Sequence, residues 1–162
     1  MPFDAFLKID GIDGESTRSG FEKQIELLSF SLGAHNSTTV GSAGAGGGAG
    51  KASVSAFNCL KATDAASPQL FQACCSGKHI AKVVVTLRKA GGDSPVDYLK
   101  YEFEKVYIAS VQWSGTSGGD NRPTESLGLA FGKVTVTYTP QSDTGATGSP
   151  VVASWDVQKV SA

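Results

Sequence analysis

Residues 67–92 read SPQLFQACCSGKHIAKVVVTLRKAGG, and this stretch joins the signals of a short helix to those of a buried strand. Ser67 is a favoured N-cap residue, Pro68 suits the first helical position, and Gly77 suits the left-handed position that ends a helix. The apolar residues of the helix fall on one stripe, made of Leu70, Phe71, Ala73 and Cys74. The stretch therefore predicts a helix from Ser67 to Gly77 that leads directly into a strand.

The strand that follows the helix carries branched side chains on both faces, because Val83, Val84 and Val85 are consecutive. We expect the helix to cover one of these faces. Apolar and polar residues alternate with a period of two in most of the remaining chain, which is the pattern of strands. The expected strands lie near residues 3–9, 24–32, 51–63, 79–89, 99–108, 127–138 and 151–157, and we expect about eight in all.

The alternation changes parity at three places along these strands. It does so between Leu27 and Leu28, between Phe103 and Val106, and around Gly132. A β-bulge shifts parity in this way and bends the strand, and burial of both faces is the other explanation at the first place. Bent strands favour the closure of a sheet into a barrel. We therefore expect a mainly β fold in one domain over residues 1–162, a small closed β-barrel of about eight strands with one short α-helix packed alongside.

Composition argues against several classes of partner. The chain of 162 residues carries 14 Lys and Arg against 15 Asp and Glu, and no basic cluster denser than Arg88–Lys89, so nucleic acid is not an expected partner. No apolar run approaches the length of about 18 residues that spans a membrane, and the N-terminus lacks a signal-peptide core. The chain is expected to fold in the cytoplasm, with no membrane partner. Charged residues make up only 18%, which leaves neutral surface for protein contacts.

Known cofactor motifs are incomplete. The glycine-rich segment 41–50 precedes Lys51, but a phosphate-binding loop would need Gly at 45 and Ser or Thr at 52, where the chain has Ala45 and Ala52. The acids near residues 10–15 lack the spacing of a calcium-binding loop. His35 and His79, the only histidines, lack the spacing of a zinc site. We therefore expect no cofactor and no metal.

The candidate nucleophiles also lack partners in the sequence. The three cysteines are best explained as reduced thiols, with Cys74 on the apolar stripe and Cys59 in a strand. A reactive pair of Cys75 and His79 remains open, although buried thiols are favoured. No serine lies in a G-x-S-x-G motif. We expect no catalytic residue and no enzyme activity.

Several segments together resemble a known family. They are GES at 14–16, IELLSFS at 25–31, the helix-to-strand stretch ending in TLRKAGG at 86–92, SV at 110–111, SG at 114–115, PTES at 123–126 and YTPQ at 138–141. In this order, along nearly the whole chain, they resemble the Hcp family of bacterial type VI secretion systems. The length of the glycine tract and Cys75 depart from the family pattern.

The resemblance implies a structural role in secretion. Members of this family are expected to form hexameric rings that stack into a tube related to phage tail tubes. The implied partners are other copies of the chain, a spike protein at the tube tip, a contractile sheath, and effectors carried in the lumen. The chain would leave the cell through the type VI system without a signal peptide. The alternatives are a phage-type tail tube protein and a monomeric β-barrel that binds a small ligand in an apolar cavity.

Two sets of residues are candidates for function in a tube. The glycine-rich tract, represented by Ser42, Gly46, Gly48 and Lys51, is our hypothesis for an arm that reaches the next ring. Ser29 and Ser31 lie on the parity opposite some apolar neighbours, and a lumen that releases cargo needs small polar residues. We therefore expect these two serines to face the lumen.

Overall fold

The structure is a computed structural model that describes residues 3–37, 50–89, 95–119, 121–142 and 145–162. In these ranges the chain forms β1 (Phe3–Ile9), β2 (Ile25–Leu27), β3 (Ser29–Ser31), β4 (Ala34–Asn36), β5 (Ala52–Val54), β6 (Phe57–Ala62), α1 (Ser67–Ser76), β7 (His79–Lys89), β8 (Asp97–Ser114), β9 (Thr124–Ala130), β10 (Lys133–Tyr138) and β11 (Val151–Asp156). The fold is mainly β with one short helix, as expected.

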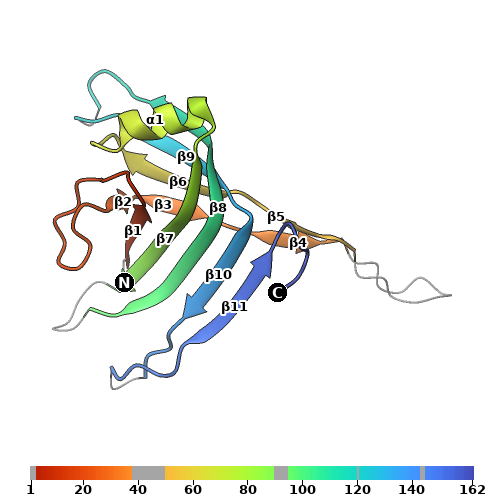
Figure 1. Cartoon of the computed structure of the whole chain (residues 1–162). Coiled ribbons are helices and arrows are strands. Elements are labelled where there is room, and N and C mark those ends of the chain that lie inside the picture. The colour runs from red at the N-terminus through yellow and green to blue at the C-terminus, as the bar shows by residue number, and fades with distance from the viewer. Residues whose placement is uncertain (1–2, 38–49, 90–94, 120, 143–144) are drawn as a thin grey trace.

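Nine of the described strands form one antiparallel sheet (Figure 1). Its main path runs β2-β1-β7-β8-β9-β6-β3, and β10 and β11 extend it from β8. The strands β4 and β5 pair with each other and project from the sheet as a separate hairpin. Because β8 is 18 residues long, it pairs with β9 along its second half and with β10 along its first half.

The sheet curves back on itself at Leu28. The two ends of the main path, β2 and β3, are neighbours in sequence and are separated only by this residue. The backbone N–H of Leu28 donates to the carbonyl of Leu60 on β6 at 2.7 Å. The expected parity change at this point is thus a break between two strands, since the chain stops pairing with β1 and starts pairing with β6.

The other two parity changes are one feature on two neighbouring strands. Lys105 of β8 has a left-handed backbone with φ of 55°, and Gly132 lies opposite it between β9 and β10. The N–H of Gly132 donates to the carbonyls of Glu104 at 2.9 Å and Lys105 at 3.2 Å. A Cβ at position 132 would lie 3.1 Å from the Cβ of Lys105, so glycine allows the close approach. The register of β8 is the same on both sides of this point, with Glu104 opposite Lys133 and Tyr107 opposite Ala130, so the β-bulge expected here is absent and both strands change parity together.

The helix has its N-cap one residue earlier than expected. Ala66 occupies the N-cap position and Ser67 is already helical, so the expected capping role of Ser67 is wrong. The Ser67 hydroxyl instead accepts bonds from the Asp64 N–H and the Lys61 ammonium, both at 3.0 Å. Gly77 ends the helix with φ of 66°, as predicted.

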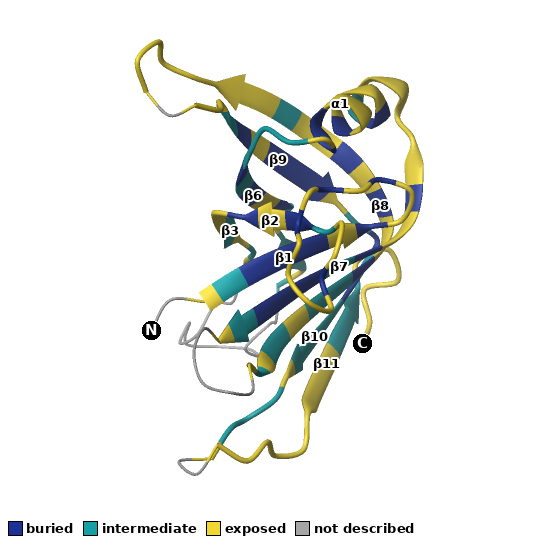
Figure 2. Ribbon diagram, turned by 90° about the vertical axis from the view of Figure 1, so that its left-hand side faces the viewer, coloured by how far each residue is buried: buried dark blue, intermediate teal, exposed yellow. Residues whose placement is uncertain are grey.

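The helix covers β8, whereas we expected it to cover β7 (Figure 2). One face of β7 contributes Val83, Val85 and Leu87 to the core. On its other face, Thr86 pairs with Phe6 of β1, and the ring of Phe6 stacks on Phe21 with 4.3 Å between centroids. The segment between β1 and β2 therefore provides the cover that the sequence assigned to the helix.

The core lies between the curved sheet and α1. Its fully buried members include Leu7, Ile25, Phe57, Leu70, Val83, Phe103 and Leu129. Ring contacts such as that between Phe57 and Phe103, at 5.2 Å, join strands that are distant in sequence. In the described part of the chain, no helix has the length and hydropathy needed to cross a membrane.

Candidate functional site

The four strands β3, β6, β9 and the end of β8 present a continuous outer face, which we call the polar face. The strand register sets its residues in two rows, one of Ser31, Asn58, Gly128 and Ser110, the other of Ser29, Leu60, Ser126 and Gln112. None of these eight residues is charged. Several of them line a shallow hollow of about 360 Å³. The polar face is therefore neutral and made mostly of small side chains.

Ser29 and Ser31 both lie on the polar face and are exposed. Sequence reasoning selected these two serines but missed Asn58, Ser110 and Ser126, which the register places beside them. The missed residues follow the same rule, because each alternates with a buried or half-buried neighbour along its own strand. Alternation along a strand gives the side on which a residue lies, whereas the grouping of these residues into one face required the strand order.

Gly128 keeps the middle of the polar face flat. A Cβ at this position would lie very close to the Ser110 Oγ and 3.3 Å from the Asn58 Oδ1. With glycine, the side chains of the two flanking strands approach each other over β9. A larger residue would displace them, since cross-strand neighbours leave little room at this spacing.

The inner side of the same strands contains a buried ion cluster. Lys61 of β6 and Glu125 of β9 are direct cross-strand partners, and both side chains are fully buried. The Lys61 ammonium lies 3.3 Å from Glu125 Oε2 and 2.9 Å from Asp64 Oδ1, and it donates to Ser67 at 3.0 Å. The Trp113 indole N–H donates to Glu125 Oε2 at 2.8 Å. The cluster joins β6, β8, β9 and the first turn of α1.

Partner groups offset much of the cost of burying these charges. Isolated ions are very unfavourable in a protein interior, so removing one member would leave the others uncompensated. The second carboxylate oxygen of Glu125, Oε1, has no hydrogen-bond partner among the described residues.

The burial of Cys59 raises the pKa of its thiol to about 12. The nearby Lys61 charge acts on this pKa in the opposite direction, and Glu125 acts in the same direction as burial. Cys59 is thus a neutral thiol.

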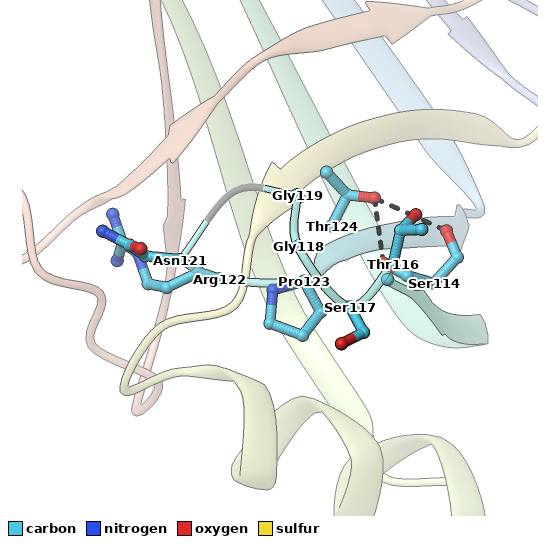
Figure 3. A pocket seen from close by; sticks show the side chains of 10 residues that line it. Ser114, Thr116, Ser117, Gly118, Gly119, Asn121, Arg122, Pro123 and Thr124 are labelled. Atoms are coloured by element: carbon cyan, nitrogen blue, oxygen red, sulfur yellow. Dashed lines mark hydrogen bonds between the residues drawn. The ribbon is translucent and has the colours of Figure 1, made fainter.

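A second hollow, of about 600 Å³, lies within the loop that joins β8 to β9 (Figure 3). At its base, the Thr124 hydroxyl donates to the Ser114 carbonyl at 3.3 Å. The far end of the loop is tied to the segment before α1, because Thr63 donates its N–H and its hydroxyl to the Pro123 carbonyl at 3.0 and 2.9 Å. Arg122 points outward from the loop and donates to the Thr63 carbonyl at 3.3 Å.

The remaining candidates do not assemble a reactive site in the described ranges. Cys75 is exposed on α1, so the expected burial of its thiol is wrong, whereas Cys59 is buried. The His79 ring packs edge-on against Tyr107 at 5.3 Å. No three His, Cys, Asp or Glu side chains in the described ranges come together as a metal site.

The proposed inter-ring arm lies mostly outside the described residues, since Ser42, Gly46 and Gly48 fall in the range 38–49. Lys51 is described and exposed directly before β5. The β4–β5 hairpin flanks this range on both sides. Between the hairpin and the strands β10 and β11 lies a mainly apolar groove of about 460 Å³, with Val54, Val136 and Trp155 among its lining residues.

Comparisons with known proteins agree along nearly the whole chain. The family model described as type VI secretion system effector, Hcp, matches residues 6–138. Hcp1 of Pseudomonas aeruginosa is 39% identical over 160 residues, which cover 98% of each protein. A solved type six secretion system protein superposes with a TM-score of 0.92 at 34% identity, covering 98% of both chains. Hcp1 of Salmonella typhimurium gives 0.81 at 36% identity, covering 99% of this chain and 98% of its own. By sequence and by fold, this chain belongs to the Hcp family of type VI secretion system proteins.

Proposed function

We propose that this chain is a tube subunit with no catalytic activity, built as one Hcp-like domain over residues 1–162. Six copies form a ring, and the rings stack into a tube. A spike protein caps the tube, a contractile sheath drives it, and effectors travel in its lumen out of the cell. The observation that carries the proposal is the neutral polar face, which ends on each side in a strand edge that no other described strand pairs with.

The two free edges favour contact between copies. Among the described strands, β3 pairs only with β6, and residues 110–114 of β8 pair only with β9. Unpaired edges readily accept another strand. Because the polar face contains four antiparallel strands, its two outer strands run in opposite directions. A head-to-tail arrangement of copies therefore brings β3 of one copy beside β8 of the next in antiparallel orientation, and such an arrangement closes into a ring.

The chemistry of the polar face fits a lumen. Small neutral side chains such as Ser29, Ser31 and Ser126 can hydrogen-bond to many cargo proteins. They provide neither a strong charge nor a large apolar anchor, so cargo that binds can also leave. Our candidate for contact between stacked rings is the exposed β4–β5 hairpin with Lys51 directly before β5, together with Ser42, Gly46 and Gly48, which lie between the two strands in the sequence and outside the described residues.

The decisive experiment measures the mass of the purified protein by light scattering and its shape by negative-stain microscopy. Rings of six copies support the proposal, and a monomer at high concentration contradicts it. The lumen assignment is then tested with Ser31→Trp and Ser126→Trp. Both variants should still form rings but should lose export of a cargo protein, and normal export would exclude these serines from the lumen.

The apolar groove beside Trp155 supports one other candidate, a monomeric barrel that binds a small apolar ligand. This candidate predicts a monomer in solution and binding of an apolar dye that Trp155→Ser weakens. The light-scattering experiment separates the two functions, because a ring-forming protein contradicts the monomeric alternative.

A further inference from the structure

Two aromatic side chains form an exposed pair at the β8 edge of these four strands, on the side opposite the polar face, because Trp113 pairs across strands with the inward-facing Glu125. Trp113 on β8 is 40% exposed and Phe71 on α1 is 49% exposed. Their ring centroids lie 5.4 Å apart. A large, ordered aromatic surface of this kind is typical of the residues that dominate protein interfaces. We call it the aromatic pair.

The buried ion cluster holds the aromatic pair in one orientation. The Trp113 indole N–H donates at 2.8 Å to Glu125, which Lys61 contacts at 3.3 Å. Lys61 in turn contacts Asp64 and Ser67, so the cluster reaches the start of the helix that carries Phe71. A side chain ordered before binding loses less entropy when a partner covers it. The cluster thus prepares the pair for contact.

The opposite edge of these four strands presents a matching apolar residue. Leu28 is 62% exposed and directly precedes β3, the strand with the other free edge. The hydrogen bond from its N–H to Leu60 fixes its backbone. In a head-to-tail ring, the edge next to Leu28 in one copy meets the edge next to Trp113 in its neighbour.

We infer that Trp113 and Phe71 form the main anchor between neighbouring copies and that they bind Leu28 of the next copy. Lys61 and Glu125 are positioning residues for this anchor. The inference rests on the proposed ring and identifies the residues that close it. The contact removes two exposed apolar surfaces at once, which neither edge achieves in an isolated copy.

The first test compares Trp113→Ala with the wild type by measuring ring dissociation on dilution, using single-particle mass measurements. We expect association at each contact to weaken by about 30-fold or more, as for an interface hot spot. Tyr138→Ala is the matched control, because Tyr138 is 46% exposed but lies at the far end of β10. Equal ring stability in the two variants would overturn the inference.

The partner residue is tested with Leu28→Ala and the double variant Leu28→Ala/Trp113→Ala. If the two side chains touch across the contact, the double variant weakens association by clearly less than the product of the two single effects. Independent effects would show that Leu28 is not the partner. Leu28 is 62% exposed and Trp113 40% exposed, and circular dichroism of each variant verifies its fold.

The positioning role is tested with Trp113→Phe, which keeps an aromatic ring but loses the N–H that Glu125 accepts. We expect an intermediate loss of association, and wild-type stability of this ring would overturn the positioning role. A monomeric wild-type protein would instead contradict the proposed ring itself. If the wild type forms rings and the Trp113→Ala rings are equally stable, only this inference is contradicted and the proposed ring stands.

Discussion

The two sides of β6 and β9 differ sharply in chemistry although they share the same backbone. The outer side carries Asn58 and Ser126, neutral and exposed, whereas the inner side carries the buried ions Lys61 and Glu125. An exposed neutral side chain costs little wherever it lies. A buried charge needs a partner at a fixed position. The inner side therefore determines the geometry of the strands, and the outer side is free to serve the proposed lumen.

The largest expected effect comes from breaking the inner side. Lys61→Met leaves Glu125 and Asp64 without their cation, so the free energy of unfolding should fall by about 3 to 5 kcal/mol. Urea denaturation measures the loss. Lys82→Ala, which removes a 51% exposed lysine paired with Glu102, is the control and should cost at most about 1 kcal/mol. Similar losses in both variants would show that burial does not distinguish the two lysines.

A double variant sharpens this comparison. Lys61→Met/Glu125→Gln removes both charges of the cross-strand pair, so it should recover part of the stability lost in Lys61→Met alone. A further loss would indicate that Glu125 is stabilised mainly by Trp113.

A smaller effect is expected at the centre of the polar face. Gly128→Val places side-chain atoms against Ser110 and should lower the free energy of unfolding by about 1 to 3 kcal/mol. Ser110→Gly in the same chain removes the clash and should restore part of the stability. Thermal unfolding of the two variants is the measurement, and the absence of any rescue would place the strain elsewhere.

The buried thiol gives an effect that depends on pH. Because burial raises the pKa of Cys59 from 9.0 to about 12, the unfolded chain loses the thiol proton above pH 9 while the folded chain keeps it. Folded protein then binds more protons, so stability should fall as pH rises above 9, by about 1.4 kcal/mol per pH unit at most. The measurement is the difference between wild type and Cys59→Ala at pH 8 and pH 10. An equal change in the free energy of unfolding between the two pH values in both proteins would contradict this prediction.

The smallest effect on stability is expected on the outer side. Ser126→Ala removes an exposed hydroxyl, so the free energy of unfolding should change by less than about 0.5 kcal/mol. Chemical denaturation measures the change. A loss as large as that of Lys61→Met would contradict the contrast between the two sides.

Local signals in the sequence predicted local features well. Gly77 ends the helix because glycine adopts the left-handed conformation without strain, and the parity changes near Gly132 and Phe103 coincide with the left-handed backbone of Lys105. Ser67 was assigned the wrong role, because its hydroxyl is bonded to Lys61, a contact that no capping rule contains.

The candidate site was predicted only in part. Ser29 and Ser31 were selected from the parity of one strand, but the residues beside them come from β6, β8 and β9. Lys61 and Glu125 received no role, because they are 64 positions apart and only the register of β6 against β9 makes them partners.

The sequence by itself determined the fold class, the family and the end of the helix, since these follow from periodicity, ordered motifs and backbone preferences of single residues. Only the tertiary structure decided which strands adjoin, that Leu28 marks the return of the sheet, and that Trp113 is held by a buried carboxylate. The physical reason is the distance along the sequence over which each interaction acts. Alternation and glycine conformation act within a few residues, whereas strand order and charge pairing depend on contacts between distant parts of the chain.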